Sequence, residues 1–193
     1  MMAYTFSEFC ADCNRALKTD SGEAGRLAVQ KHFDKILLHT EFVNEHLGEN
    51  PPPGRHIIFV DKETDMNVMV HIMDKDGFAV PHDHGPYWVI YGNATGYTDM
   101  TEFNRLDDGS KEGYAELEVS KEYRINPGDS SVYDVGDIHS IDYPANTMFI
   151  RLTSGDVESG QNLSFSMENK TVEIQDRSKQ GRVTSRVSAK ADR

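Results

Sequence analysis

Three histidines have the spacing of a metal site. His82 and His84 lie two residues apart in a Pro-His-Asp-His-Gly-Pro run, and His139 follows much later in the chain. Side chains two residues apart on a strand point to the same face, so the first two imidazoles can reach one ion. A third imidazole from another strand would complete a set of three neutral ligands and leave coordination positions for chemistry.

Three neutral ligands favour particular chemistry. They leave the full charge of a divalent ion in place, whereas a carboxylate ligand would cancel part of it. We therefore expect anionic, bidentate substrates, whose pKa the ion would lower. Fe(II) is the natural ion if dioxygen is the second reactant, although the ligand set alone leaves Zn, Ni and Mn open.

The rest of the chain must supply the elements that hold these ligands. The first fifty residues have helical periodicity, with one helix capped by Ser7 and a second that begins near Asp20 and ends at Gly48. From Arg55 onward, short β-rich runs alternate with turn residues. Strands are expected at residues 56–61, 67–73, 87–91, 96–103, 114–123, 131–133, 138–141, 147–153, 162–167 and 171–174. So many short strands predict an antiparallel sandwich or barrel.

The motifs around the histidines resemble those of the cupins. Gly77, His82, His84 and Gly96 match the first cupin motif, although the spacing is not regular throughout. The second motif, P-G-D…H, is matched by the run 127–129 and His139. The resemblance covers about residues 53–155. It implies a mainly β fold, the cupin double-stranded β-helix or jelly-roll barrel, with the N-terminal helices packed on it.

Within the cupins, the chain resembles the three-histidine thiol dioxygenases. The glutamate of the first motif is missing, because its position falls at Trp88 or Val89. Cysteine dioxygenase and mercaptopropionate dioxygenase share the H-D-H string. Arg55 occupies the place where cysteine dioxygenase has an arginine that grips the substrate carboxylate. The resemblance thus implies an iron site with a carboxylate-binding arginine beside it.

The chain also departs from the thiol dioxygenases. Their Ser-x-His-x-Tyr relay aligns with a strand in which Arg151 replaces the histidine and Thr153 the tyrosine. The cysteine that crosslinks to tyrosine in the animal enzymes aligns with Val89. Arg151 and Arg55 are therefore our candidates for binding a substrate carboxylate, and Tyr87 is the candidate for a catalytic hydroxyl. Tyr91 and Tyr133 are further candidates for a hydroxyl in the pocket.

Composition limits the domain organisation and the binding partners that we expect. The formal net charge of -12 disfavours nucleic-acid binding, which calls for a basic face. We expect one cupin domain over residues 1–175, helical over 1–50 and a β-barrel over 55–175. Residues 176–193 hold six Lys/Arg and two Asp, a local charge of +4, and are expected to form a solvated, disordered tail. No apolar leader run and no membrane span is evident, so a cytoplasmic protein is expected.

The leading functional prediction is a non-haem Fe(II) cupin dioxygenase. It would oxidise a small anionic substrate, most simply a thiol acid, to a sulfinate, with O2 as co-substrate. One alternative keeps the metal but cleaves a carbon–carbon bond of a diketone, or acts as a lyase or isomerase. Another is a non-catalytic cupin that binds a metal or a ligand. No membrane partner is expected, and a homodimer is left open.

Overall fold

The computed structural model describes residues 4–179 and 184–186. Three helices precede the strands: α1 (Phe6–Thr19), α2 (Glu23–Leu37) and α3 (Glu41–Leu47). Thr5 rather than Ser7 caps α1, in a capping box with Glu8. The predicted second helix is two helices, because the His39 N–H donates to the Ile36 carbonyl and closes α2 early. Among the described residues, no helix is both long and apolar enough to cross a membrane.

The strands form two six-stranded sheets. In spatial order, the first sheet contains β12 (Ser185–Arg186), β1 (Gly54–Val60), β2 (Asn67–Met73), β9 (Thr147–Thr153), β4 (Val89–Thr95) and β7 (Ser130–Tyr133). The second contains β11 (Thr171–Asp176), β10 (Gln161–Ser166), β3 (Gly77–His82), β8 (Ile138–Tyr143), β5 (Thr98–Arg105) and β6 (Leu117–Ile125). All neighbours are antiparallel except β1 and β12. This arrangement confirms the predicted jelly-roll barrel with N-terminal helices.

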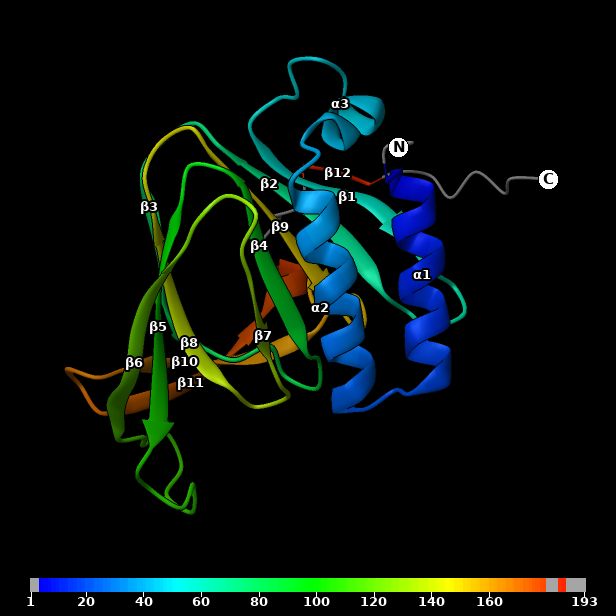
Figure 1. Ribbon diagram of the computed structural model, residues 1–193. Coiled ribbons are helices and arrows are strands. Elements are labelled where there is room, and N and C mark those ends of the chain that lie inside the picture. Colours follow the sequence, from blue (N-terminus) through cyan, green and yellow to red (C-terminus); the bar gives the residue numbers. More distant parts are fainter. Residues whose placement is uncertain (1–3, 180–183, 187–193) are drawn as a thin grey trace.

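Alternation along β9 divides its apolar side chains between two of the apolar clusters. Ile150 and Leu152 of β9 pack with α1 and α2 in one apolar cluster. Phe149, their neighbour on β9, joins Tyr91 in a second cluster between the sheets. Side chains of a strand alternate between faces, so β9 contributes to both. Figure 1 shows α1 and α2 alongside β1, β2, β9 and β4, so the helices cover the outer face of the first sheet and leave the barrel interior to the site.

The C-terminal segment departs in part from the predicted solvated tail. Arg177, in a short 3₁₀ helix (Arg177–Lys179), is only 7% exposed. Ser185 and Arg186 pair in parallel with β1, and the Thr184 N–H donates to the Arg55 carbonyl. The Arg177 side chain and the backbone of residues 184–186 thus have partners in the barrel, which composition alone does not reveal. The remainder of the predicted tail, residues 180–183 and 187–193, lies outside the described residues.

Candidate metal centre

The two strands that carry the histidines are neighbours in the second sheet. His82 ends β3 and is paired in register with His139 of β8. His84 lies two residues beyond the end of β3, not within the strand itself. A turn fixes it there: Oδ1 of Asp83 accepts the N–H of Leu163 at 2.7 Å and that of Gly85 at 3.1 Å. Gly85 adopts φ +60°, a conformation that favours glycine.

The structure brings the three predicted ligands together inside the barrel. One ligand atom from each of His82, His84 and His139 lies within 4.8 Å of the others, and all three residues are buried. The Nε2 atoms of His84 and His139 are 3.4 Å apart. Two nitrogens bound to one ion at about 2.1 Å lie roughly 3.0–3.4 Å apart for right-angle to tetrahedral arrangements. The facing Nε2 atoms therefore fit a shared cation.

The other ring nitrogens differ in their contacts. His82 Nδ1 lies 2.8 Å from the Val80 carbonyl, which is a hydrogen bond when Nδ1 carries the proton and leaves Nε2 as the ligand atom. Among the described residues, Nδ1 of His84 has no hydrogen-bond partner. The carboxylates of Asp83 and Asp137 accept backbone N–H groups instead, and the contact of His139 with Asp137 is through the Asp137 backbone, which acts to raise the pKa of His139. The orientation of the His84 and His139 rings is therefore set more by packing than by a hydrogen bond to a carboxylate.

Burial favours the neutral form of His84 and of His139. The pKa of His84 is lowered well below its usual value by burial and by the charges of His82 and His139. The pKa of His139 is lowered likewise by burial and by His82, Arg177 and Arg151. A neutral imidazole offers the lone pair that a metal requires. His84 and His139 therefore keep a lone pair available for a cation.

Two tyrosines, not Tyr87, lie against the histidines. The Tyr91 hydroxyl is 3.3 Å from His84 Nε2. The Tyr133 ring packs on that of His139 with 4.1 Å between centroids and the two planes tilted by 31°. The Tyr87 ring instead packs beside the backbone of Gly155 and Gly160, in the turn after β9, and does not line the cavity described below. Tyr91 is therefore the hydroxyl that the fold places at the centre.

The predicted arginines converge on a carboxylate that the sequence did not single out. Arg151, only 2% exposed, donates a short hydrogen bond to Glu158 Oε1. Arg55 Nη1 lies 3.4 Å from Glu158 Oε2. Arg177, predicted to be solvated, places Nη1 3.7 Å from Oε1 of the same carboxylate. Burial acts to raise the pKa of Glu158, but the attraction of Arg151 and Arg55 outweighs it and holds this pKa low.

The arginines and two histidines line a cavity. Its volume is about 230 Å³, and its walls include Arg55, Arg151, Tyr91 and His82. His71 also lines it, with its ring stacked on Phe149 at 4.3 Å. Burial and the nearby arginines, Arg151 first, lower the pKa of His71 well below its usual value. No motif marked His71 or Glu158 in the sequence, because each reaches the site only through strand pairing or a turn.

The sequence matches no protein-family model, and no curated protein is significantly similar to it. Solved structures with partial likeness include KdgF from Halomonas sp., at 18% identity and a TM-score of 0.39 over 54% of this chain and 83% of that one. DMSP lyase DddQ from Ruegeria pomeroyi DSS-3 has 21% identity and a TM-score of 0.35 over 49% of this chain and 41% of that one. An oxalate oxidase in complex with the substrate analogue glycolate has 20% identity and a TM-score of 0.32 over 46% and 39%. The order of the strands in the two sheets defines the fold of this chain.

Proposed function

We propose that this protein is a cupin-type metalloenzyme that uses Fe(II) and O2 to oxidise a small thiol acid to a sulfinate. The observation that carries the proposal is the group of three buried histidines, of which His82 lines a cavity that also presents arginines. An anionic substrate is attracted to such a cavity, and three neutral ligands leave the charge of the ion available to it.

His82, His84 and His139 would hold the iron. When bound, Fe(II) supplies the redox chemistry that joins a thiolate to dioxygen, so that R–SH + O2 gives R–SO2H. Sulfur loses four electrons in this reaction and O2 gains four, with both oxygen atoms retained in the sulfinate. No external reductant is required.

The remaining residues of the cavity would bind and orient the substrate. Arg55 can hold a carboxylate through paired hydrogen bonds, and only 17% of its side chain is exposed to water. Arg151 is fixed by Glu158, so it contributes charge from a fixed position. The Tyr91 hydroxyl, 3.3 Å from His84 Nε2, can donate a hydrogen bond to a group bound beside that histidine. Phe149 and Ile141 line the apolar side and limit water.

The proposal is tested by His84→Ala, with His39→Ala as the matched control. His39 is exposed between α2 and α3, far from the ligand set in sequence and on another element. We expect anaerobically purified wild type and His39→Ala to bind about one iron per chain, and His84→Ala to lose it together with O2 uptake. Retained iron and undiminished O2 uptake with thiol acids in His84→Ala would reject the proposal.

A second candidate function is a metal-dependent lyase or isomerase. The observation that favours it is the absence of the thiol dioxygenase relay: Arg151 and Thr153 stand in its place, and the Thr153 hydroxyl donates to the Gly155 carbonyl. The Tyr91 hydroxyl could then move a substrate proton beside the metal. Turnover of a diketone or hydroxy acid at full rate under argon would favour this candidate over oxidation of a thiol.

A further inference from the structure

The cavity at the histidines adjoins a second chamber. The inner chamber, of about 230 Å³, is the one that Arg55 and Arg151 line. The outer chamber, of about 410 Å³, is lined by polar side chains that include Asn162, Ser164 and Gln175. His82 and Arg177 line both chambers, so the two meet at these residues. A ligand held beside His82 therefore has polar space on two sides.

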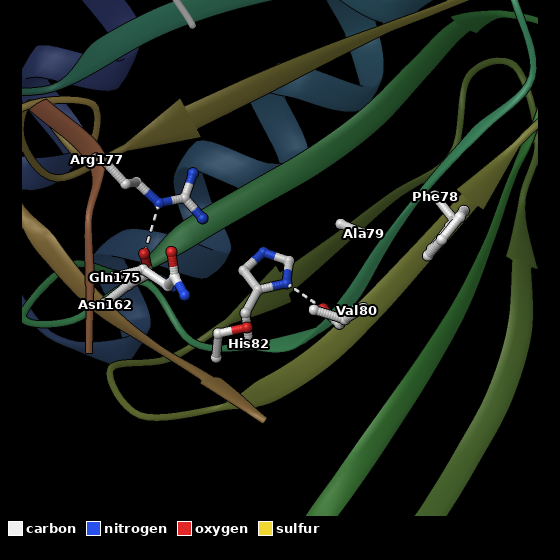
Figure 2. A pocket seen from close by; sticks show the side chains of 8 residues that line it. Phe78, Ala79, Val80, His82, Asn162, Gln175 and Arg177 are labelled. Atoms are coloured by element: carbon white, nitrogen blue, oxygen red, sulfur yellow. Dashed lines mark hydrogen bonds between the residues drawn. The ribbon is translucent and has the colours of Figure 1, made fainter. Parts of the chain in front are cut away.

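Arg177 is fixed at this junction. Its Nε donates to Asn162 Oδ1 at 2.8 Å, and only 7% of the residue is exposed. Figure 2 shows the terminal nitrogens of Arg177 directed toward the space next to the His82 ring. A guanidinium has five N–H donors in a planar fork that suits a carboxylate. Nη1 of the same group lies 3.7 Å from Glu158 Oε1, so the guanidinium is held from two sides at the wall that both chambers share.

The charge of the cavity contrasts with that of the chain. The whole protein has a formal net charge of -12, whereas Arg55, Arg151 and Arg177 surround one carboxylate, Glu158. A cleft of one sign with apolar walls concentrates field lines and draws in ligands of the opposite sign. Three guanidinium groups on one cavity exceed what a single small carboxylate needs, because one fork already binds it with two hydrogen bonds.

We infer that the substrate carries two acidic groups, the first bound by Arg55 in the inner chamber and the second by Arg177 in the outer chamber. The Gln175 and Asn162 amides lie beside the second position as further polar groups. The inference deepens the proposed function, on which it rests for the reacting group. Arg177 is then a specificity-determining residue that selects a diacid over a monoacid with the same reacting end.

Calorimetric titration of the full-length purified protein with succinate and with propionate, at matched ionic strength, tests the inference. We expect succinate to bind about tenfold or more tightly than propionate, in line with one additional charge-assisted hydrogen-bonded group. Arg177→Gln should abolish that difference and leave propionate binding unchanged. Arg15→Gln, on the exposed face of α1 and 74% exposed in its side chain, is the matched control and should change neither.

A second variant avoids the removal of a buried charge. Gln175→Glu places a carboxylate in the outer chamber while Arg177 and its bond to Asn162 remain, and it should weaken succinate binding by about tenfold but not propionate binding. Equal affinities of wild type for the two acids, or equal losses of both in Arg177→Gln and in Gln175→Glu, would overturn the inference. Because no O2 is consumed in these titrations, a failure of thiol oxidation would not alter their outcome.

Discussion

Glu158 should contribute strongly to stability, and Glu158→Gln tests how much. The substitution keeps the shape of the side chain but removes its charge. Arg151 would then remain 2% exposed, with Arg55 and Arg177 close by, and without the carboxylate on which all three converge. A guanidinium cannot lose its proton in a protein, so the charge stays buried.

The magnitude follows from the burial of the pair. Removing one partner of a buried ion pair costs about 3–5 kcal/mol, because the other charge is left in a poorly solvating environment. For a chain of this size, a loss of 1 kcal/mol lowers Tm by about 2–4 °C. We therefore expect Glu158→Gln to lower Tm by roughly 6–20 °C. Adding Arg151→Met should recover part of the loss, since an apolar pair replaces a buried charge.

The effect should depend on pH with a defined sign. The pKa of Glu158 lies below its ordinary value of 4.5, because the attraction of the arginines outweighs the effect of burial. A carboxyl whose pKa is lower in the folded state stabilises the protein fully above the unfolded value and loses this contribution as the pH falls through the folded value. The difference between wild type and Glu158→Gln should therefore be constant near neutral pH and shrink below pH 4.5.

Thermal unfolding followed by circular dichroism measures the effect, with Glu122→Gln as control. Glu122 is exposed on β6, so its substitution should change the free energy of unfolding by less than about 0.5 kcal/mol. A Glu158→Gln variant that melts within about 2 °C of wild type at neutral pH would refute the reasoning. An unpaired buried charge should lower the free energy of unfolding by more than that shift in Tm represents.

Two further predictions concern the supports of the site. Gly92→Val should lower Tm by about 2–12 °C in the same unfolding assay. The reason is that even a Cβ at Gly92 would lie 2.7 Å from Phe33 Cε1. An unchanged Tm would contradict tight packing of α2 on β4. Asp83→Ala should weaken iron binding about 10–100-fold in a metal titration, because Asp83 holds the turn that presents His84. Asp83→Asn keeps an acceptor oxygen and should retain most of the affinity, and equal losses in both variants would argue against this role.

Local pattern predicted most of the barrel. The strands Asn67–Met73 and Thr147–Thr153 are found at the predicted residues, because β-branched and aromatic residues bounded by turns mark such strands. The strand Gly77–His82 was not predicted. Phe78 and Val80 are its outward residues, 73% and 47% exposed, and Pro81 interrupts the pattern, so the usual alternation of apolar and polar residues is absent.

The sequence predicts those site residues that a local motif marks, and it does not predict those that only tertiary contacts bring to the site. The spacing of the histidines marks a metal site, although His84 reaches it through the turn that Asp83 fixes and not through a strand face shared with His82. Glu158 is placed by a turn, Arg177 by a 3₁₀ helix after the last long strand, and His71 by pairing with Phe149. None of these three has a local sequence signature, because burial and partner are both set by chain segments distant in sequence.

Incubation of the iron-loaded protein with a thiol acid under ¹⁸O2 tests the central claim most directly. Mass spectrometry of the product should show a sulfinate in which both oxygen atoms carry the label, in wild type and not in His84→Ala. A product whose oxygen comes from water, or turnover that proceeds equally without O2, would contradict the assignment of this three-histidine centre to thiol dioxygenation.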